Sequence, residues 1–256
     1  MLHHVEQGYG ESVLLLPGFA CTHSMYTAQL VALSDQYRVI AVDLRGTGDS
    51  PPLQCAPERV FPTQAHDLTE LLDGLHIPRA HLVGSSTGGN VALRFALAHP
   101  DRVRSLTLVD TTAQDDAETP FEKVSRFADR AALGFLRAPR QLLGGIALQR
   151  YSRWPEVGLL MAQYYREADP ETLILLRRAA LDERVAPELA GLEIPALVLA
   201  GDFSPPLVSA GHQLANLLPR ARFASIGDAL DPSVLCRPEV FNRVLRDFLE
   251  HVGRPG

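Results

Sequence analysis

The sequence predicts an α/β protein in which a mostly parallel sheet carries helices on both faces and a block of helices is inserted into the chain. Three observations support this prediction. Short runs rich in Val, Leu and Ile alternate with amphipathic segments near the start of the chain, a pattern typical of parallel strands buried on both faces. Between residues 113 and 190 the alternation stops, and the patterns are helical. After residue 190 the alternation resumes.

The expected strands are the apolar runs, most of which end in Gly, Asp or Pro-Gly. They cover residues 12–18, 39–43, 81–83, 103–110, 194–201 and 221–227. The clearest helices follow these runs, and the first of them repeats leucines at helical spacing. They cover residues 63–75, 87–99, 206–218 and 238–252.

We therefore predict a core made of residues 1–112 and 191–256, and a helical cap made of residues 113–190. The cap leaves from the carboxyl end of the strand at 103–110. Open α/β sheets bind ligands at that edge. The cap is therefore expected to cover a binding site, and an ordinary helical subdomain is the alternative.

Composition excludes several classes of function. Of the 256 residues, 46% are hydrophobic and 21% are charged, and the net charge is −6 with acids and bases interspersed. We find no basic stripe for nucleic acid, no polybasic or long apolar run for a membrane, and no apolar segment of a secretory signal. Three scattered cysteines fit neither a disulfide framework nor a metal site. We expect a cytoplasmic monomer or homodimer that binds a small molecule without a metal or cofactor.

The stretch on which the site depends is Gly84-Ser85-Ser86-Thr87-Gly88, which fits the pattern G-x-S-x-G. A short apolar run precedes it and an amphipathic helix pattern follows it, as this motif requires when the serine sits on a strained strand-to-helix turn. The first N–H groups of such a helix point toward the serine. We expect the Ser86 hydroxyl to stand out of the sheet, and a glycine-rich turn with a buried serine is the alternative.

Together with this elbow, three further stretches make the chain resemble the α/β-hydrolase superfamily, in its branch with a helical cap. They are LLLPGF at 14–19, VDLRGTGDS at 42–50 and RPEVFNRVLRDFL at 237–249. The four stretches cover nearly the whole chain in the expected order. The resemblance implies that Ser86 is the nucleophile and that the backbone N–H groups of Phe19 and Thr87 form the oxyanion hole.

Two positions of the implied catalytic triad depart from the family pattern. The acid position holds Ser204, although Asp202 lies two residues earlier and would face the same way in an extended chain; a turn cap is the alternative for Asp202. The histidine position before the last helix holds Asp231. An ordinary carboxylate is a weak base at neutral pH, because its pKa is about 3.9. Burial would have to raise the pKa of Asp231 by several units.

A second source of a base is a histidine elsewhere in the chain. His23 lies four residues after Phe19 and is the candidate surrogate, with a capping or surface role as the alternative. Candidates for lining the substrate cavity are aromatic residues of the cap, with packing inside the cap as their alternative, and the hydroxyl of Ser204. The aromatic residues are Phe135, Trp154, Tyr164 and Tyr165.

These residues predict an enzyme that acts on a small, largely apolar molecule with a carbonyl group. The resemblance implies an ancestor that hydrolysed an ester, thioester or carbon–carbon bond. Removing the base from a serine triad costs roughly a millionfold in turnover. We therefore expect an elimination, isomerisation or cyclisation in a biosynthetic pathway, with Asp231 as acid or base beside an oxyanion hole. Two alternatives stay open: a non-catalytic sensor or carrier, and a slow hydrolase whose base is His23 or the substrate.

Overall fold

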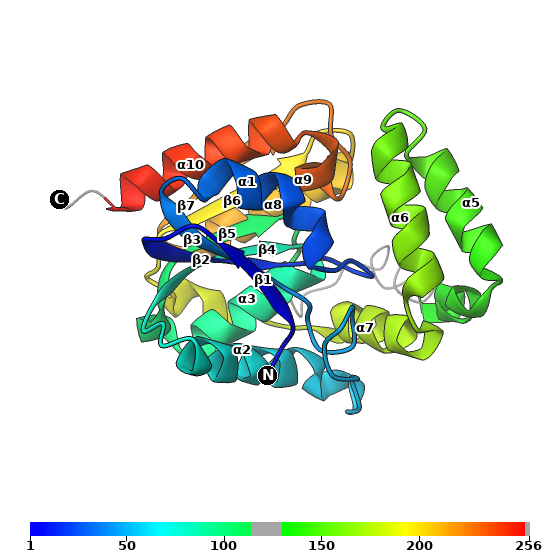
Figure 1. Ribbon diagram of the computed structural model, residues 1–256, viewed down its shortest axis with the longest axis horizontal. Helices are drawn as coiled ribbons and strands as arrows, with labels where there is room; N and C mark the ends of the chain where they lie inside the picture. Colours follow the sequence, from blue (N-terminus) through cyan, green and yellow to red (C-terminus); the bar gives the residue numbers. More distant parts are fainter. Residues whose placement is uncertain (114–129, 254–256) are drawn as a thin grey trace.

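A computed structural model describes residues 1–113 and 130–253 of the chain (Figure 1). Within these ranges the centre is a seven-stranded sheet with the order β1-β3-β2-β4-β5-β6-β7. β1 is antiparallel to β3, and the other neighbouring pairs are parallel. The strands are β1 (His4–Gln7), β2 (Glu11–Leu16), β3 (Tyr37–Val42), β4 (Ala80–Ser85), β5 (Val103–Val109), β6 (Ala196–Gly201) and β7 (Ala221–Ile226).

The sheet has an apolar core on each face. Along β2, Leu14 and Leu16 belong to one core, and Val13 and Leu15 belong to the other. All four side chains are fully buried. Successive side chains of a strand point to opposite faces, so a strand that is covered on both sides has no polar alternation. This explains why the strands appear in the sequence as continuous apolar runs.

Helices cover the two cores. The first core receives leucines from α2 (Val60–Gly74), apolar residues of α3 (Thr87–Ala98) and Leu214 of α8 (Pro205–Leu217). The second receives Leu30 of α1 (Thr27–Leu33) and Phe241 of α10 (Pro238–Gly253). Figure 1 shows α1 and α10 above the sheet and α2 and α3 below it. Helices on both faces of a mostly parallel sheet are the predicted α/β architecture.

Between β5 and β6 the described residues form helices. These are the 3-10 helix η4 (Ala132–Arg137), then α5 (Arg140–Arg150), α6 (Pro155–Glu167), α7 (Pro170–Asp182) and the 3-10 helix η5 (Ala186–Gly191). We call residues 130–195 the helical insertion. Figure 1 shows its helices α5 and α6 side by side, beyond one end of the sheet. Residues 114–129 of the predicted cap lie outside the described residues.

The helical insertion connects two neighbouring strands, β5 and β6, which run parallel. The chain therefore leaves the carboxyl edge of the sheet after β5 and returns at the amino edge before β6. Asp110 follows β5 and links its carboxyl end to that of β6. Its N–H donates to the carbonyl of Leu199 over 2.9 Å, and its carboxylate accepts the N–H of Gly201 over 2.9 Å. These bonds join the carboxyl ends of β5 and β6, at the edge of the sheet where the insertion begins.

The first strand, β1, is missing from the sequence-based prediction. It is an edge strand of four residues whose side chains are mostly exposed, so it has no apolar run. His4 pairs with Val42 of β3, and the imidazole of His3, just before the strand, bonds to Asp43. No helix of the described chain is long and apolar enough to cross a membrane.

Candidate active site

Ser86 sits on a strained turn between β4 and α3. Its backbone has φ 50° and ψ −116°, in a region that non-glycine residues seldom adopt. Strain of this kind persists where the surrounding structure imposes it. Here the Ser86 N–H donates to the carbonyl of Val109 over 2.7 Å. The turn thus holds the Ser86 side chain at the carboxyl edge of the sheet, as the motif predicts.

The glycines around Ser86 permit this turn. A Cβ on Gly84 would lie 2.5 Å from the carbonyl oxygen of Gly88. A Cβ on Gly88 would lie 2.3 Å from the carbonyl oxygen of Leu16. Real Cβ atoms do not approach backbone this closely, so both positions require glycine. The same contact presses the start of α3 against the loop that follows β2.

The two expected oxyanion donors lie beside Ser86. Thr87 is the first residue of α3, and the first four N–H groups of a helix have no partner within it. The loop that carries Phe19 approaches from β2, since a Cβ on Gly18 would lie 3.4 Å from the Cβ of Ser86. Phe19 and Ser86 also line one cavity. Two backbone N–H donors next to the serine are suited to stabilise the negative charge that develops on the carbonyl oxygen of a substrate.

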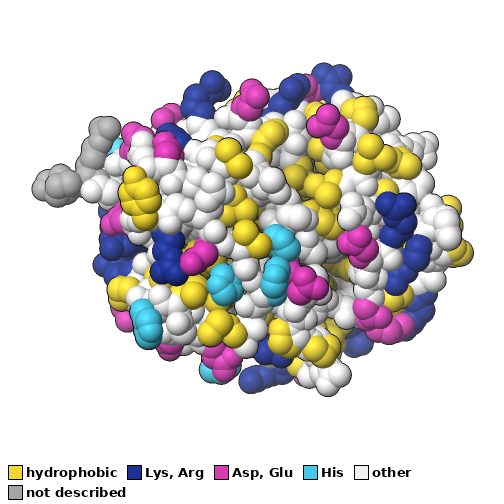
Figure 2. Space-filling view, in the orientation of Figure 1, with side chains coloured by type: hydrophobic (Ala, Val, Ile, Leu, Met, Phe, Trp, Pro, Cys, Tyr) yellow, Lys and Arg dark blue, Asp and Glu magenta, His cyan; other side chains and the backbone are white. Residues whose placement is uncertain are grey.

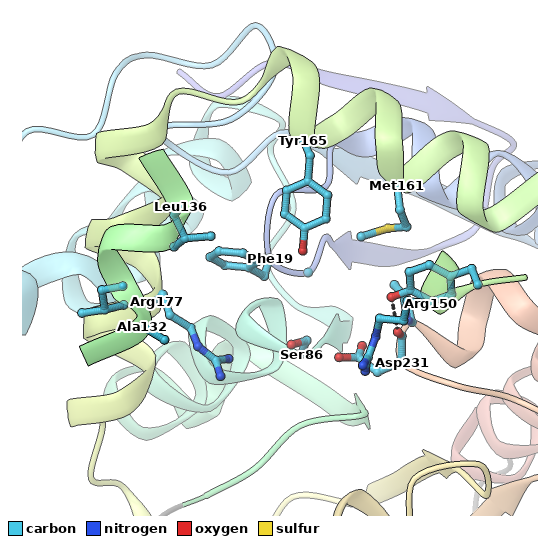
Figure 3. Close-up of a pocket in the computed structure, with 13 residues that line it drawn as sticks. Phe19, Ser86, Ala132, Leu136, Arg150, Met161, Tyr165, Arg177 and Asp231 are labelled. Atoms are coloured by element: carbon cyan, nitrogen blue, oxygen red, sulfur yellow. Dashed lines mark hydrogen bonds between the residues drawn. The ribbon is translucent and has the colours of Figure 1, made fainter. Parts of the chain in front are cut away.

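The cavity above Ser86 has a volume of about 380 Å³. Its walls come from the strand ends and from the helical insertion. The lining residues are Gly18, Phe19, Ser86, Ala132, Leu133, Leu136, Arg150, Tyr151, Met161, Tyr165, Arg177, Asp231 and Pro232. Figure 3 shows Tyr165 and Met161 on the same helix, above Ser86 and Asp231. Burial raises the pKa of Tyr165 to about 12, so its hydroxyl is a neutral hydrogen-bond donor at neutral pH.

Asp231, at the position of the family histidine, lies in this cavity. It stands in the loop between β7 and α9 (Ser233–Cys236). Burial, with a smaller effect from Asp110, raises the pKa of the Asp231 carboxyl to about 8, although Arg150 and Arg177 act in the opposite direction. The Tyr151 hydroxyl donates to its backbone carbonyl over 2.6 Å. Among the described residues no hydrogen bond joins the Ser86 and Asp231 side chains, and both face the cavity (Figure 3).

Asp110 supports the loop that carries Asp231. Besides the N–H of Gly201, its carboxylate accepts the backbone N–H of Ser233 over 2.7 Å. Burial raises the pKa of Asp110. Through these hydrogen bonds Asp110 joins the chain after β5 to the end of β6 and to the start of α9.

The cavity holds two arginines that sequence reasoning did not single out. Arg150 ends α5 and Arg177 lies in α7, and both line the cavity with Asp231. Helical spacing gives no signal for Arg177, because Leu173, four residues earlier on the same helix, lines a different cavity. The sequence also gives no sign that Arg150 lines the cavity, because its position there depends on where α5 ends.

Three candidates from the sequence are placed elsewhere. His23 does not reach Ser86: its Nδ1 lies 2.8 Å from a carboxylate oxygen of Asp43, and it lines a different cavity. Hydrogen bonds from His23 and Asp49 outweigh burial and hold the pKa of Asp43 below its ordinary value. Asp202 is exposed, and its carboxylate accepts the N–H of Ala229 over 3.4 Å. The chain turns after Gly201, so the extended-chain argument for Asp202 is wrong. Ser204 stands before α8 as its N-cap residue and is not among the residues that line the cavity.

Of the four aromatic candidates, Tyr165 lines the cavity. Tyr164 turns the other way and its hydroxyl bonds to that of Ser24 over 2.7 Å. Trp154 is buried against Phe203 with ring centroids 5.3 Å apart, and Phe135 is exposed to solvent. For Trp154 the alternative is therefore correct: its side chain packs against the core and does not line the cavity.

A serine on a strained strand-to-helix turn above a parallel sheet defines the class, and comparison with known proteins agrees. Residues 11–236 match the model of the alpha/beta hydrolase fold family, so the chain belongs to the α/β-hydrolase family. The predicted fold, a mostly parallel sheet flanked by helices, is confirmed.

Relatives of this chain include several hydrolases. It is 33% identical to a candidate carbamate hydrolase, RutD, of Variovorax paradoxus, over 96% of this chain and 94% of the relative. A thermophilic esterase from Thermogutta terrifontis, solved with malate bound, is 29% identical with a TM-score of 0.84, over 99% of this chain and 94% of the esterase. The enol-lactonase of Burkholderia xenovorans is 26% identical with a TM-score of 0.82, over 97% and 96%.

Proposed function

We propose that the chain is an enzyme that moves a proton next to a carbonyl group of a small anionic molecule, in an elimination, isomerisation or cyclisation. The observation that carries the proposal is the carboxyl of Asp231, which lies in the Ser86 cavity with a pKa of about 8. A catalytic acid or base works best when its pKa lies near the operating pH. Burial thus gives the Asp231 carboxyl a pKa near neutral pH, which an ordinary carboxylate lacks.

In this mechanism Asp231 in its ionised form removes a proton from the carbon beside the carbonyl. The negative charge then moves to the carbonyl oxygen, where the N–H groups of Phe19 and Thr87 stabilise it. The Ser86 hydroxyl stands between these donors and Asp231 and holds the substrate by a hydrogen bond. The helical insertion acts as the cap, since Tyr165, Met161 and Leu136 close the cavity opposite Ser86.

The two arginines suggest the chemical class of the substrate. Leu133, Leu136 and Met161 provide an apolar wall, which agrees with the largely apolar molecule predicted from the sequence. Arg150 and Arg177 add two guanidinium groups, which suit carboxylate or phosphate groups. We therefore propose a substrate with an apolar part and an anionic group, small enough for about 380 Å³.

Pairs of compounds that share a carbon skeleton but differ in charge test the proposed anionic class of substrate. Small 2-oxo and 3-oxo carboxylates are compared with their methyl amides by the shift they cause in the melting temperature. We expect the carboxylates to raise it more, because binding to the native state stabilises it. Arg150→Gln should remove most of the difference, whereas Arg243→Gln, on the distant helix α10, should not. Equal shifts within each pair would rule out an anionic substrate.

Hydrolysis is the second candidate, and two observations favour it. The chain keeps the strained serine turn, and its relatives bear the names of a carbamate hydrolase, an esterase and a lactonase. Here Asp231 would take the proton of the Ser86 hydroxyl as the serine attacks the carbonyl carbon. A raised pKa serves this step as well.

Ser86→Ala separates the two reactions. If Ser86 gives one hydrogen bond, turnover should fall by no more than about tenfold. If Ser86 is the nucleophile, turnover should fall by about a millionfold, as in a serine triad. Labelling with a fluorophosphonate is the second measurement, with Ser209→Ala, on an exposed position of α8, as control. Labelling that depends on Ser86 would replace the proton-transfer proposal by hydrolysis.

A non-catalytic sensor or carrier would bind the same ligands without converting them. Turnover of any ligand from the paired screen excludes this alternative. A ligand that raises the melting temperature and is recovered unchanged, in the wild type as in Asp231→Asn, would support it against both reactions.

A further inference from the structure

A second group of titratable side chains lies outside the Ser86 cavity. His3 precedes β1, His23 begins the 3-10 helix η1 (His23–Tyr26), and Asp43 follows β3. The Nδ1 atoms of His3 and His23 lie 2.9 Å and 2.8 Å from the two carboxylate oxygens of Asp43. The imidazole rings have centroids 5.0 Å apart. Three separate segments of the chain thus bring two imidazoles and one carboxylate to one point.

The spacing of these atoms is close to that of a metal site. One ligand atom from each residue lies within 4.8 Å of the others. In tetrahedral zinc sites, metal–ligand distances of about 2.0–2.2 Å place neighbouring ligand atoms about 3.4 Å apart. The distances of 2.8 Å and 2.9 Å would have to open by about half an ångström, and the two imidazoles that would move are partly exposed.

The carboxylate of Asp43 is held in place independently of the histidine rings. It is fully buried and accepts the backbone N–H groups of His23, over 2.7 Å, and Asp49, over 3.1 Å. The loop closes on it at Gly48, where a Cβ would lie 2.2 Å from a carboxylate oxygen. One ligand is therefore fixed in advance, and the two imidazoles remain 35% and 26% exposed.

The cavity beside this group favours a cation. Its volume is about 460 Å³, and His23 lies in its wall. Four carboxylate residues line it, Asp43, Asp49, Glu167 and Asp169, and no Lys or Arg does so among the described residues. The Ser86 cavity, in contrast, contains two arginines. Figure 2 shows histidine and acidic side chains together near the middle of the face of the molecule that is turned to the viewer.

We propose that His3, His23 and Asp43 bind a divalent transition metal ion, with Zn²⁺ as the ion tested. Two imidazoles and one carboxylate suit Zn²⁺, whereas Mg²⁺ prefers oxygen ligands. A neutral histidine that donates through Nδ1 can bind through that atom once its proton moves to Nε2, so binding needs no net loss of protons from neutral rings. A fourth position would face the cavity and hold water. This site differs from the sequence-based expectation of no metal, and it does not depend on the proposed function.

Zinc titration of the full chain tests the site after dialysis against a chelator. We expect wild-type protein to bind one Zn²⁺ and to melt at a higher temperature, because the ion ties the residue before β1 to the end of β3. Mg²⁺ at the same concentration should have no effect. Co²⁺ in place of Zn²⁺ should give a visible absorption spectrum of nitrogen and oxygen ligands.

The variants His3→Gln and His23→Gln keep an N–H donor toward Asp43 and remove the imidazole ligand. Each should weaken Zn²⁺ binding by at least about tenfold, the loss found even for partners of ligands. Each should also abolish the Co²⁺ spectrum. His66→Ala removes an exposed histidine elsewhere and should change neither result. Zn²⁺ binding that survives in the double glutamine variant, or its absence in folded wild-type protein, would overturn the proposal.

Discussion

Replacement of Asp231 by asparagine is expected to lower kcat/KM by at least about a hundredfold, because general acid–base catalysis contributes about 10² to 10⁴. Asparagine keeps the size of the side chain and can donate a hydrogen bond, but it cannot take a proton. The Tyr151 bond goes to the backbone carbonyl of residue 231, so it remains in the variant. The loss therefore reports on proton transfer rather than on the position of the loop.

The pH profile of the wild type tells which form of Asp231 is active. As a base, Asp231 must be ionised, so kcat/KM should rise with pH and level off above about 8, the pKa of its carboxyl. As an acid it must be protonated, and kcat/KM should fall above that pH. Asp101→Asn, at an exposed position in the 3-10 helix η3 (Pro100–Arg102) before β5, is the matched control and should keep the wild-type profile. Unchanged kcat/KM in Asp231→Asn would remove Asp231 from the mechanism.

The second large effect concerns stability. In the unfolded chain the Asp231 carboxyl has its ordinary pKa of 3.8, and in the folded protein burial raises it to about 8. Between these values the unfolded state releases a proton that the folded state keeps. The free energy of unfolding should therefore fall as pH rises from about 4 to about 8, by up to about 1.4 kcal/mol per pH unit for one group. The buried carboxyl of Asp110, whose pKa is also raised, acts in the same direction.

Urea unfolding between pH 5 and pH 9 measures this effect. Asp231→Asn should flatten the slope and should be more stable than the wild type at pH 8, because its amide does not ionise. At pH 5 the difference between the two proteins should be smaller than at pH 8, because pH 5 lies only about one unit above the ordinary pKa of the carboxyl. Asp101→Asn should retain the wild-type slope. A steep wild-type slope that persists in Asp231→Asn would assign the effect to other groups and leave Asp231 with an ordinary pKa.

Local sequence was enough to predict the fold and the position of the elbow. The apolar runs of β2, β4, β5 and β6 are long because both faces of these strands are buried. At the elbow, positions 84 and 88 must be glycine because neighbouring backbone atoms leave no room for a Cβ. This requirement can be recognised in the sequence as the pattern G-x-S-x-G. β1 escaped prediction because one edge strand with exposed side chains carries no apolar signal.

The chemistry of the site depended on contacts between distant parts of the chain. The position of Asp231 could be read from the final helix, but its raised pKa depends on burial under residues of the insertion and on Asp110. Arg150 and Arg177 reach the cavity from two separate helices. His23 was expected near the elbow because it is close to Phe19 in sequence, yet the buried carboxylate of Asp43 holds it in another cavity. Spacing along the chain does not show which of two neighbouring cavities a loop residue faces.

The link between β5 and β6 has an evolutionary consequence. Asp110 follows β5, and its carboxylate accepts the N–H of Gly201 at the end of the adjacent β6 over 2.9 Å. This bond and the strand pairing hold the register of the two strands through contacts that lie outside the helical insertion. Ser86, Asp231 and the expected oxyanion donors lie in the core, while Arg150, Tyr165 and Arg177 lie in the insertion. A change of the insertion would therefore alter the residues proposed to contact the substrate and leave the residues proposed to react in place.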